Sequence, residues 1–320
     1  MKKALVVFLA IVAVAIPVFA QGAQEAAAFP TKQVTVVCQA NPGGSSDLNC
    51  RTIAPGMEEA LGVPVVVENR PGAGGGIALT YVASAPADGY LVAHLPLDIA
   101  QVKPAGNAEV TPADFRFLAR VFYHPAAIIV KSDSKYQTIE EFVAAAKANP
   151  NGVTVGNSGT GAVWHLGAVQ FEKAAGIQLN HIPFEGAAPS ITALMGGHID
   201  AIVASAAEVA SQVQSGDLKI LCVMADEPFG LFPEVPTAKS CGYDVSVPCW
   251  CAFGVAKDTP DDVYNTLLEA MRKSFNSETY QNMLKTKGYQ AAWLEGEAMD
   301  KFAQEEYEVY SVLIPEVLGY

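Results

Sequence analysis

The chain has 320 residues, 51% of them hydrophobic, and a net charge of −13 from 33 acidic and 20 basic residues. Its length suits one large domain or two of moderate size, and its hydrophobic fraction is sufficient for a sizeable core. The acidic balance argues against nucleic acid as a partner, because nucleic-acid binding needs a basic face.

The first 20 residues have the pattern of a secretory signal peptide. Lys2 and Lys3 form a basic start, residues 4–17 are mostly apolar, and Val18-Phe19-Ala20 fits a small-residue cleavage site. The apolar run is too short for a membrane span, and no later run is long enough. We therefore predict an exported, periplasmic or otherwise extracytoplasmic protein. Without Lys2 and Lys3 it carries 18 basic against 33 acidic residues, a charge of −15.

Six cysteines are present, and the sequence leaves their disulfide state open. Export permits disulfides, but a chain of this size does not require them. Bridges between Cys38 and Cys50, or between Cys241 and Cys249, are the pairings that we consider. No cysteine or histidine cluster has the spacing of a zinc site, so we expect no metal.

The first part of the chain alternates strand and helix patterns. Strands are predicted at residues 34–38, 65–68 and 90–94, and helices at 48–61 and 77–84. Such alternation predicts a parallel sheet with right-handed crossovers.

The loop after the first strand, Pro42-Gly43-Gly44-Ser45-Ser46-Asp47, is the strongest candidate for a binding element. A small-residue loop that opens a helix presents backbone N–H groups and a partial positive charge, which suit an anion. Gly43 and Gly44 allow a close approach of the ligand. We expect Ser45 or Ser46 to cap the helix.

The same alternation recurs later in the chain. Its predicted elements are strands at 126–130, 153–155, 179–182, 201–204, 218–224 and 250–255, helices opening at 138 and following residues 161, 186 and 204, and a tail helix at 297–310. We predict two α/β domains with a cleft between them, one made of residues 29–124 with 225–320 and the other of residues 125–224. Ligands in such folds lie at the carboxyl ends of the strands, where the Gly/Ser loops are.

No motif supports catalysis or a cofactor. Residues 72–77 fail the dinucleotide fingerprint at Ile77, and residues 156–160 miss the nucleophile motif G-x-S-x-G at Thr160. Nothing in the spacing of Ser158, His165 and Asp200 supports a catalytic triad. Three Gly/Ser/Thr loops that open helices, without a nucleophile–base pair, indicate a binding cleft.

Six short motifs follow one another in an order shared with a known family. They are P-G-G-S-S-D at 42–47, V-V-E-N-R-P-G-A-G-G at 66–75, A-D-G-Y at 87–90, S-G-T-G at 158–161 with His165-Leu166, Phe184-Glu185-Gly186, and P-E-V-P-T at 233–237. This order resembles the Bug-type solute-binding proteins of tripartite tricarboxylate transporters. The resemblance implies a two-domain type II periplasmic-binding-protein (Venus-flytrap) fold that captures a small organic carboxylate and delivers it to an integral membrane permease. We expect a monomer.

The resemblance also implies the site residues. The ligand carboxylate would be held by two loops and covered by a third segment, and these residues are Pro42, Gly43, Gly44, Ser45 and Asp47, then Ser158, Thr160 and His165, then Phe184, Glu185 and Gly186. Many relatives carry a basic or neutral residue where Glu185 stands. A carboxylate there disfavours a second ligand anion. The ligand would then have one carboxylate with a neutral or cationic group, unless Glu185 points away.

Two other functions remain open at this point. An exported hydrolase could use Ser158 as its nucleophile, and a ligand-sensing protein could dock on a membrane receptor instead of a permease. The sequence names neither the carboxylate nor the permease.

Overall fold

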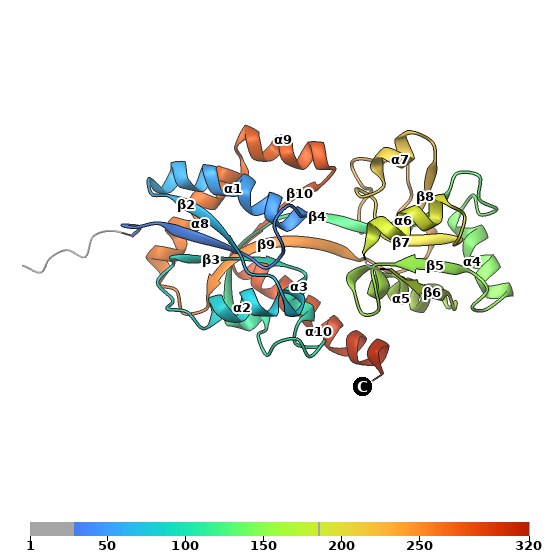
Figure 1. The fold of residues 1–320 in the computed structure, drawn as a ribbon, viewed down its shortest axis with the longest axis horizontal. Helices are drawn as coiled ribbons and strands as arrows, with labels where there is room; N and C mark the ends of the chain where they lie inside the picture. The colour runs from blue at the N-terminus through green and yellow to red at the C-terminus, as the bar shows by residue number, and fades with distance from the viewer. Residues whose placement is uncertain (1–28, 185, 320) are drawn as a thin grey trace, which may run out of the picture.

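The computed structural model describes residues 29–184 and 186–319. The predicted signal peptide and Glu185 lie outside the described residues. Figure 1 shows two lobes placed side by side along the long axis of the molecule and joined by extended strands. Among the described helices, none is both long and apolar enough to cross a membrane.

The sheet of the first lobe is parallel on one side and antiparallel on the other. Its strands, in spatial order, are β2 (Val65–Asn69), β1 (Val34–Cys38), β3 (Leu91–Pro96), β9 (Pro248–Ala256) and β4 (Phe115–Lys131), with β10 (Gln290–Glu295) also paired to β4. β1 runs parallel to β2 and β3, as the alternation of strands and helices predicts. β9 runs antiparallel to β3 and β4.

The sheet of the second lobe begins on the far half of β4. Its other strands are β7 (Ala201–Ser205), β5 (Thr154–Asn157), β6 (Asn180–Pro183) and β8 (Leu218–Met224). β5 is parallel to β6 and β7, whereas β7 and β8 are antiparallel to β4.

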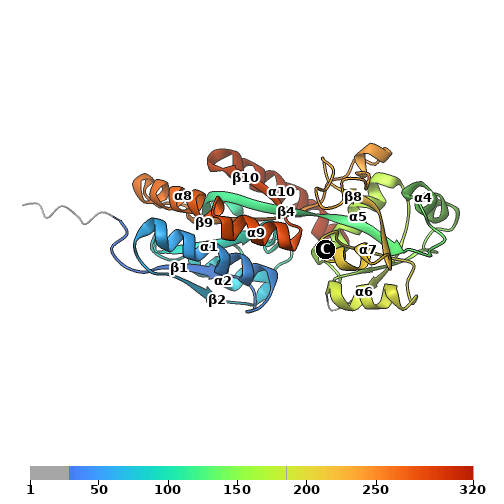
Figure 2. The same ribbon diagram turned by 90° about the horizontal axis from the view of Figure 1, so that it is seen from above.

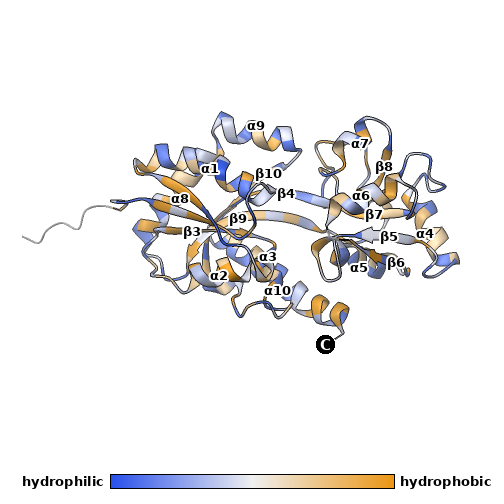
Figure 3. Cartoon of the chain, viewed as in Figure 1, coloured by the Kyte–Doolittle hydropathy of each residue, from blue (hydrophilic) through white to orange (hydrophobic). Residues whose placement is uncertain are grey.

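Helices cover both faces of each sheet. The first lobe carries α1 (Ser45–Leu61), α2 (Gly76–Ala83), α3 (Asp98–Gln101), α8 (Asp261–Phe275), α9 (Glu278–Lys287) and α10 (Gly296–Leu318); the second carries α4 (Ile139–Ala148), α5 (Val163–Ala175), α6 (Ala187–Met195) and α7 (Ala210–Gln214). Figure 3 shows hydrophobic residues gathered along the strands of both lobes.

β1 shows why the sheet is covered on both sides. Its side chains are buried at Val36 and Val37, which belong to two different core clusters. Successive side chains of a strand point to opposite faces, so Val36 packs with α1 and α8 while Val37 packs with α2 and α3. A continuous β-branched run in a parallel sheet is typical of this arrangement.

β4 is the long element that joins the lobes, as Figure 2 shows from above. It has 17 residues, and its first half pairs with β9 and β10 while residues from Ala126 onward pair with β7 and β8. The sequence predicted only residues 126–130 as strand. The earlier half escapes prediction because two register shifts, after Phe117 and after Arg120, interrupt its alternation.

Two further expectations are wrong, and one strand was missed. The residue that caps α1 is Gly44, which makes no side-chain capping bond, so neither Ser45 nor Ser46 has that role. The strand β10 was not predicted. The tail helix continues to Leu318, and its last turn reaches the second lobe, where Glu316 pairs with Lys173 of α5.

Candidate functional site

The loop between β1 and α1 is tied down by the helix that follows it. The backbone N–H of Gly43, whose φ is +89°, donates to Oδ2 of Asp47 at 2.9 Å. Leu48 is the first residue whose N–H bonds back into the helix, to Gly44. The N–H groups of the preceding turn therefore have no backbone partner among the described residues, as expected at a helix N-terminus. Pro42, Gly43, Gly44 and Ser45 are exposed.

Asp47 supports this loop from inside the protein. Its side chain is buried, at 4% exposure, and its oxygens also accept from Nε of Arg51 at 3.0 Å and from Nδ2 of Asn69 at 2.9 Å. Arg51 and the donated N–H of Gly43 favour the charged carboxylate and lower the pKa of Asp47 to about 2. Because both carboxylate oxygens already accept hydrogen bonds, Asp47 holds the loop in shape and does not point toward the site of a ligand.

The loop between β5 and α5 is built in the same way. The N–H of Gly161 donates to Nδ1 of His165 at 3.0 Å, and the N–H of Gly159 donates to Oδ1 of Asn157 at 3.0 Å. Leu166 is the first residue of this helix to bond back, to Ala162. A second helix N-terminus thus presents backbone donors without partners among the described residues.

His165 is neutral and serves this loop. Its ring is nearly buried, and burial, followed by the charge of nearby His181, lowers the pKa of His165 below its ordinary value. Accepting from Gly161 leaves Nδ1 without a proton and places the proton on Nε2. The ring also packs edge-on against His181, with 4.8 Å between centroids.

A cavity of about 490 Å³ lies between the lobes and receives residues from both. Its lining includes Gly74, Asp98 and Gln101 from the first lobe and Thr160 and Gly161 from the second. None of its lining residues is Lys or Arg. An anion held there must therefore rely on neutral hydrogen-bond donors.

Asp98 is the charged residue of this cavity. It opens α3 and lines the cavity, and it is not among the site residues that the sequence predicts. Burial raises the pKa of Asp98 to about 6, and no ion pair from the described residues reaches it. Gly75, in the glycine-rich segment after β2, lies beside Asp98, because an added Cβ there would lie 3.0 Å from Gln39 and 3.7 Å from Asp98. Of the predicted site residues, Thr160 lines this cavity, whereas the first loop, residues 42–47, does not contribute to its lining.

Tyr289 lies at the junction of the lobes. Burial raises the pKa of Tyr289 to about 12. The Tyr289 ring stacks on His124 with 5.4 Å between centroids, and His124 lies 5.8 Å from Trp164 in the second lobe. This aromatic row leads from the first lobe across to α5.

The third predicted segment lies beside the second loop. Gly159 packs against the carbonyl oxygen of Phe184, which an added Cβ would approach to 3.4 Å. The N–H of Phe184 donates to the carbonyl of Asn157 at 3.1 Å, and Gly186, with φ +108°, precedes α6. Glu185 lies outside the described residues, so its predicted role in selectivity stays a prediction.

Two unsatisfied polar groups belong to the second loop. Nδ2 of Asn157, a residue that is 1% exposed, and Oγ of Ser158 have no hydrogen-bond partner among the described residues. Sequence analysis proposed Ser158 but missed Asn157. Its position directly before a Ser-Gly-Thr-Gly loop at the end of a strand is the signal that could have found it.

Two of the residues considered for a catalytic triad, Asp200 and His165, form hydrogen bonds with residues outside the triad. Oδ2 of Asp200 accepts from the N–H and hydroxyl of Thr154 at 3.0 and 2.7 Å. Nδ1 of His165 is taken by Gly161, as described above. Ser158 therefore has no hydrogen bond to His165 in the described part of the chain.

A buried polar network stands behind the first loop and was not predicted. Tyr280 of α9 donates its hydroxyl to Oδ1 of Asn49 at 2.6 Å, which directs the Asn49 amide N–H to Nε2 of His94 at 3.0 Å. Nδ1 of His94 then donates to Oε1 of Gln39 at 2.8 Å, and Gln39 donates to Ser46 at 3.2 Å. Burial lowers the pKa of His94 to about 3, so the ring is neutral.

Comparisons with known proteins agree with this architecture. A family model described as "Tripartite tricarboxylate transporter family receptor" matches residues 49–318. The "UPF0065 protein in the TAR-I ttuE-ttuC' intergenic region" of Agrobacterium vitis is 31% identical and covers 78% of this chain and 73% of its own length. A solved structure of a TctC solute-binding protein from Polaromonas, without ligand, is 36% identical with a TM-score of 0.84 and covers 90% of this chain and 99% of its own.

A second solved structure shares the fold at lower identity. MatC from Rhodopseudomonas palustris, with bound malate, is 24% identical with a TM-score of 0.72 and covers 89% of this chain and 100% of its own. Together the solved structures confirm the predicted α/β fold of a periplasmic solute-binding protein.

Proposed function

Since the chain belongs to the family of tripartite tricarboxylate transporter receptors, we propose that it captures a small organic carboxylate between its lobes and delivers it to an integral membrane permease. Its relatives are solute-binding receptors rather than enzymes, and receptors of this family are periplasmic. The proposal includes export through the first 20 residues and function as a monomer.

The observation that carries the proposal is the pair of glycine loops at the N-termini of α1 and α5. Each places backbone N–H groups, which have no backbone partner within the described ranges, at the start of a helix of 17 or 13 residues. A carboxylate loses several kcal/mol on desolvation, whereas each charge-assisted hydrogen bond returns about 1.5–3 kcal/mol. Three or four such donors suffice without Lys or Arg.

We assign different roles to the residues of these loops. Gly44, Ser45, Ser158 and Thr160 supply the donors that bind the ligand carboxylate. Two side chains, Asp47 and His165, hold the loops in shape from behind. The remaining predicted residues, Pro42, Gly43, Phe184, Glu185 and Gly186, form the edges of the site.

We propose two domains that close around the ligand. The first consists of residues 29–124 with 225–320, and the second of residues 125–224. The supporting observation is that β4 passes from one lobe to the other and that β9 returns beside it, paired from Phe115 to Pro125. Hinge closure about a few extended segments is a common motion of solute-binding proteins.

The ligand class rests on the same geometry. MatC, which shares the fold, was solved with malate. In this chain, neutral donors at both loops and the single carboxyl group of Asp98 in the cavity favour a small carboxylate over a highly charged one. We propose an acid with one or two carboxylates.

Gly44→Val tests the proposal. An added Cβ at Gly44 meets only the carbonyl of Asn41, at 3.8 Å, and its φ is −81°, so the fold accepts a side chain there. The valine would occupy the space of the ligand carboxylate, and binding of malate, succinate, adipate or citrate, measured by calorimetry, should weaken at least about tenfold.

The matched control is Gly230→Val, at an exposed glycine whose added Cβ meets no atom within 4 Å. Both variants should unfold at the wild-type temperature, and only the Gly44 variant should lose affinity. Unchanged affinity in the Gly44 variant, or no binding of any tested acid to the wild type, would overturn the proposal.

A further inference from the structure

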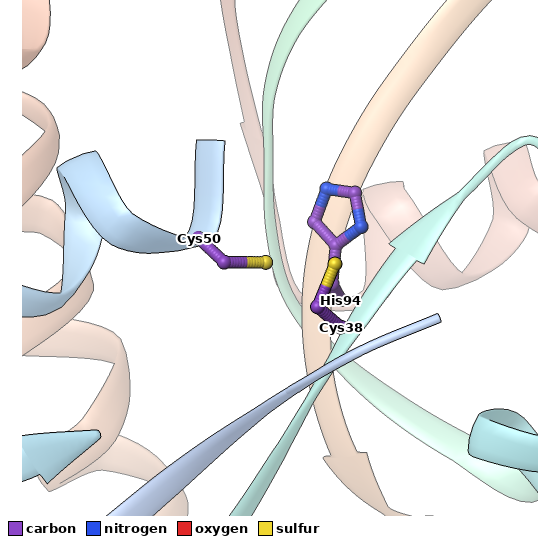
Figure 4. Close-up of side chains that lie close together, drawn as sticks. All are labelled: Cys38, Cys50 and His94. Atoms are coloured by element: carbon purple, nitrogen blue, oxygen red, sulfur yellow. The ribbon is translucent and has the colours of Figure 1, made fainter. Parts of the chain in front are cut away.

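Two cysteines and a histidine meet directly behind the first loop. Cys38 ends β1, Cys50 lies in α1 and His94 lies in β3, and their sulfur and nitrogen atoms all lie within 4.8 Å of one another. All three are 0% exposed. Figure 4 shows the sulfur of Cys50 pointing from α1 toward Cys38 and His94.

The sulfur atoms of Cys38 and Cys50 lie within 4.8 Å of each other. The Cys38 thiol donates long hydrogen bonds, each of 3.9 Å, to Oε1 of Gln39 and to the carbonyl of Ala40. Burial raises the pKa of Cys50 well above its ordinary value. Cys38 and Cys50 are therefore a close pair of buried thiols.

The donor set of two sulfurs and an imidazole would suit a soft metal such as Cu⁺ or Zn²⁺. The surroundings of His94 argue against it. Both ring nitrogens are already hydrogen-bonded, Nδ1 to Gln39 at 2.8 Å and Nε2 to Asn49 at 3.0 Å. Within the described ranges, the cluster has no fourth ligand for a tetrahedral zinc site.

We propose that Cys38 and Cys50 form a covalent cross-link, a disulfide made while the exported chain folds. In the folded structure both are free thiols, and their burial excludes an oxidant. The thiol–disulfide exchange that forms the bond therefore takes place before α1 packs onto β1. A disulfide-bearing oxidant is attacked by one thiolate and forms a mixed disulfide. The second thiolate then displaces it, so that two thiols lose two electrons and two protons while the oxidant becomes two thiols.

The cross-link would enclose the first loop. Residues 39–49 lie between the two sulfurs, and this segment includes Gly43, Gly44 and Ser45. Closing a loop removes conformations from the unfolded chain and stabilises the fold. If the proposed function holds, the same bond pre-orders the segment that receives the carboxylate. The bond itself does not depend on that function.

The test is differential thiol labelling of the full chain, expressed in a bacterial host and purified from the periplasm without reductant. The protein is unfolded in excess iodoacetamide, which blocks the free thiols. It is then reduced, and N-ethylmaleimide labels the thiols that the reduction releases. Peptide mapping should find the second label on Cys38 and Cys50 and the first label on Cys222. Reduction should lower the unfolding midpoint by roughly 5 °C or more.

Two variants sharpen the result. Cys50→Ser should move Cys38 to the first label, whereas Cys222→Ser, at a buried thiol of the second lobe, should leave the Cys38 label unchanged. If Cys50→Ser fails to fold, the wild-type map alone decides.

Three outcomes would overturn the proposal. They are the first label on both Cys38 and Cys50, a bridge that joins other cysteines, and Zn²⁺ or Cu⁺ retained by protein whose Cys38 and Cys50 are free, measured by elemental analysis. Carboxylate binding is not read in this experiment, so its result and that of the Gly44 test are independent.

Discussion

The backbone N–H of Gly43 lies 2.9 Å from Oδ2 of Asp47, four residues further along the chain. Gly161 and His165 repeat this relationship at 3.0 Å in the other lobe. In both loops, the side chain is the third residue of the following helix and the glycine belongs to the loop. Each helix thus fixes the loop that precedes it and leaves its own first N–H groups available to a ligand.

Replacing Asp47 should change how stability depends on pH. Its pKa is about 2 in the folded state and about 3.9 in an unfolded chain. A lowered carboxyl pKa contributes stability that is present above about pH 4 and lost as the pH falls toward 2. Asp47→Asn keeps the shape but removes the charge, so it should cost about 1–3 kcal/mol at pH 7, from weakened charge-assisted hydrogen bonds.

Urea unfolding from pH 7 to pH 2 measures this difference. The gap between the wild type and Asp47→Asn should shrink between pH 4 and pH 2. Asp133→Asn, at a side chain that is 77% exposed, is the control and should show little gap at any pH. A gap that stays constant down to pH 2 would show that the charge of Asp47 does not stabilise the fold.

His165→Phe should weaken ligand binding more than it weakens the fold. Phenylalanine keeps the aromatic packing against His181, but Gly161 loses its acceptor, and the loop of Ser158 and Thr160 loses its anchor. The lost hydrogen bond is worth about 1 kcal/mol, and ligand binding must then order the loop without it. A cost of that size corresponds to roughly fivefold weaker binding in calorimetry.

The control for this change is His198→Gln, at an exposed histidine of the same lobe. It should bind like the wild type. Equal affinity of His165→Phe and wild type would contradict the role assigned to His165, whereas a protein that no longer unfolds cooperatively would mean that the ring is needed for the core.

Much of the fold follows from local sequence. The strand at residues 34–38 and the helix that opens at Thr138 appear in the structure where the sequence predicts them. The first half of β4 could not be predicted in this way, because Pro125 and two bulges hide its alternation. Pairing with β9, more than a hundred residues away, makes it a strand.

The sequence predicts which loops form the candidate site, but it does not predict the side-chain contacts within them. Glycine-rich segments before helices identify where an anion can bind, and the sequence places them correctly after β1 and β5. The roles of Asp47 and His165 depend on which way the side chains turn. The meeting of Cys38, Cys50 and His94 joins three elements, and no sequence spacing encodes it.

Asp98→Asn should strengthen binding of a dicarboxylate and remove part of its pH dependence. Asp98 lines the cavity with a pKa of about 6, so above that pH its negative charge repels an anionic ligand. As the pH falls from 8 to 6 the carboxyl gains a proton, and wild-type affinity for malate should rise. The variant has no charge to lose, and at pH 7.5 it should bind roughly 3- to 10-fold more tightly.

Calorimetry of both proteins at each pH gives the ratio of their affinities. The titration of malate itself cancels in that ratio, which should approach one as Asp98 becomes protonated in the wild type. Asp244→Asn, at a side chain that is 96% exposed, removes the same charge from the surface and should leave the affinity unchanged. Weaker binding by Asp98→Asn would instead mean that Asp98 contacts a cationic or donor group of the ligand, and that the solute carries an amine or hydroxyl beside its carboxylate.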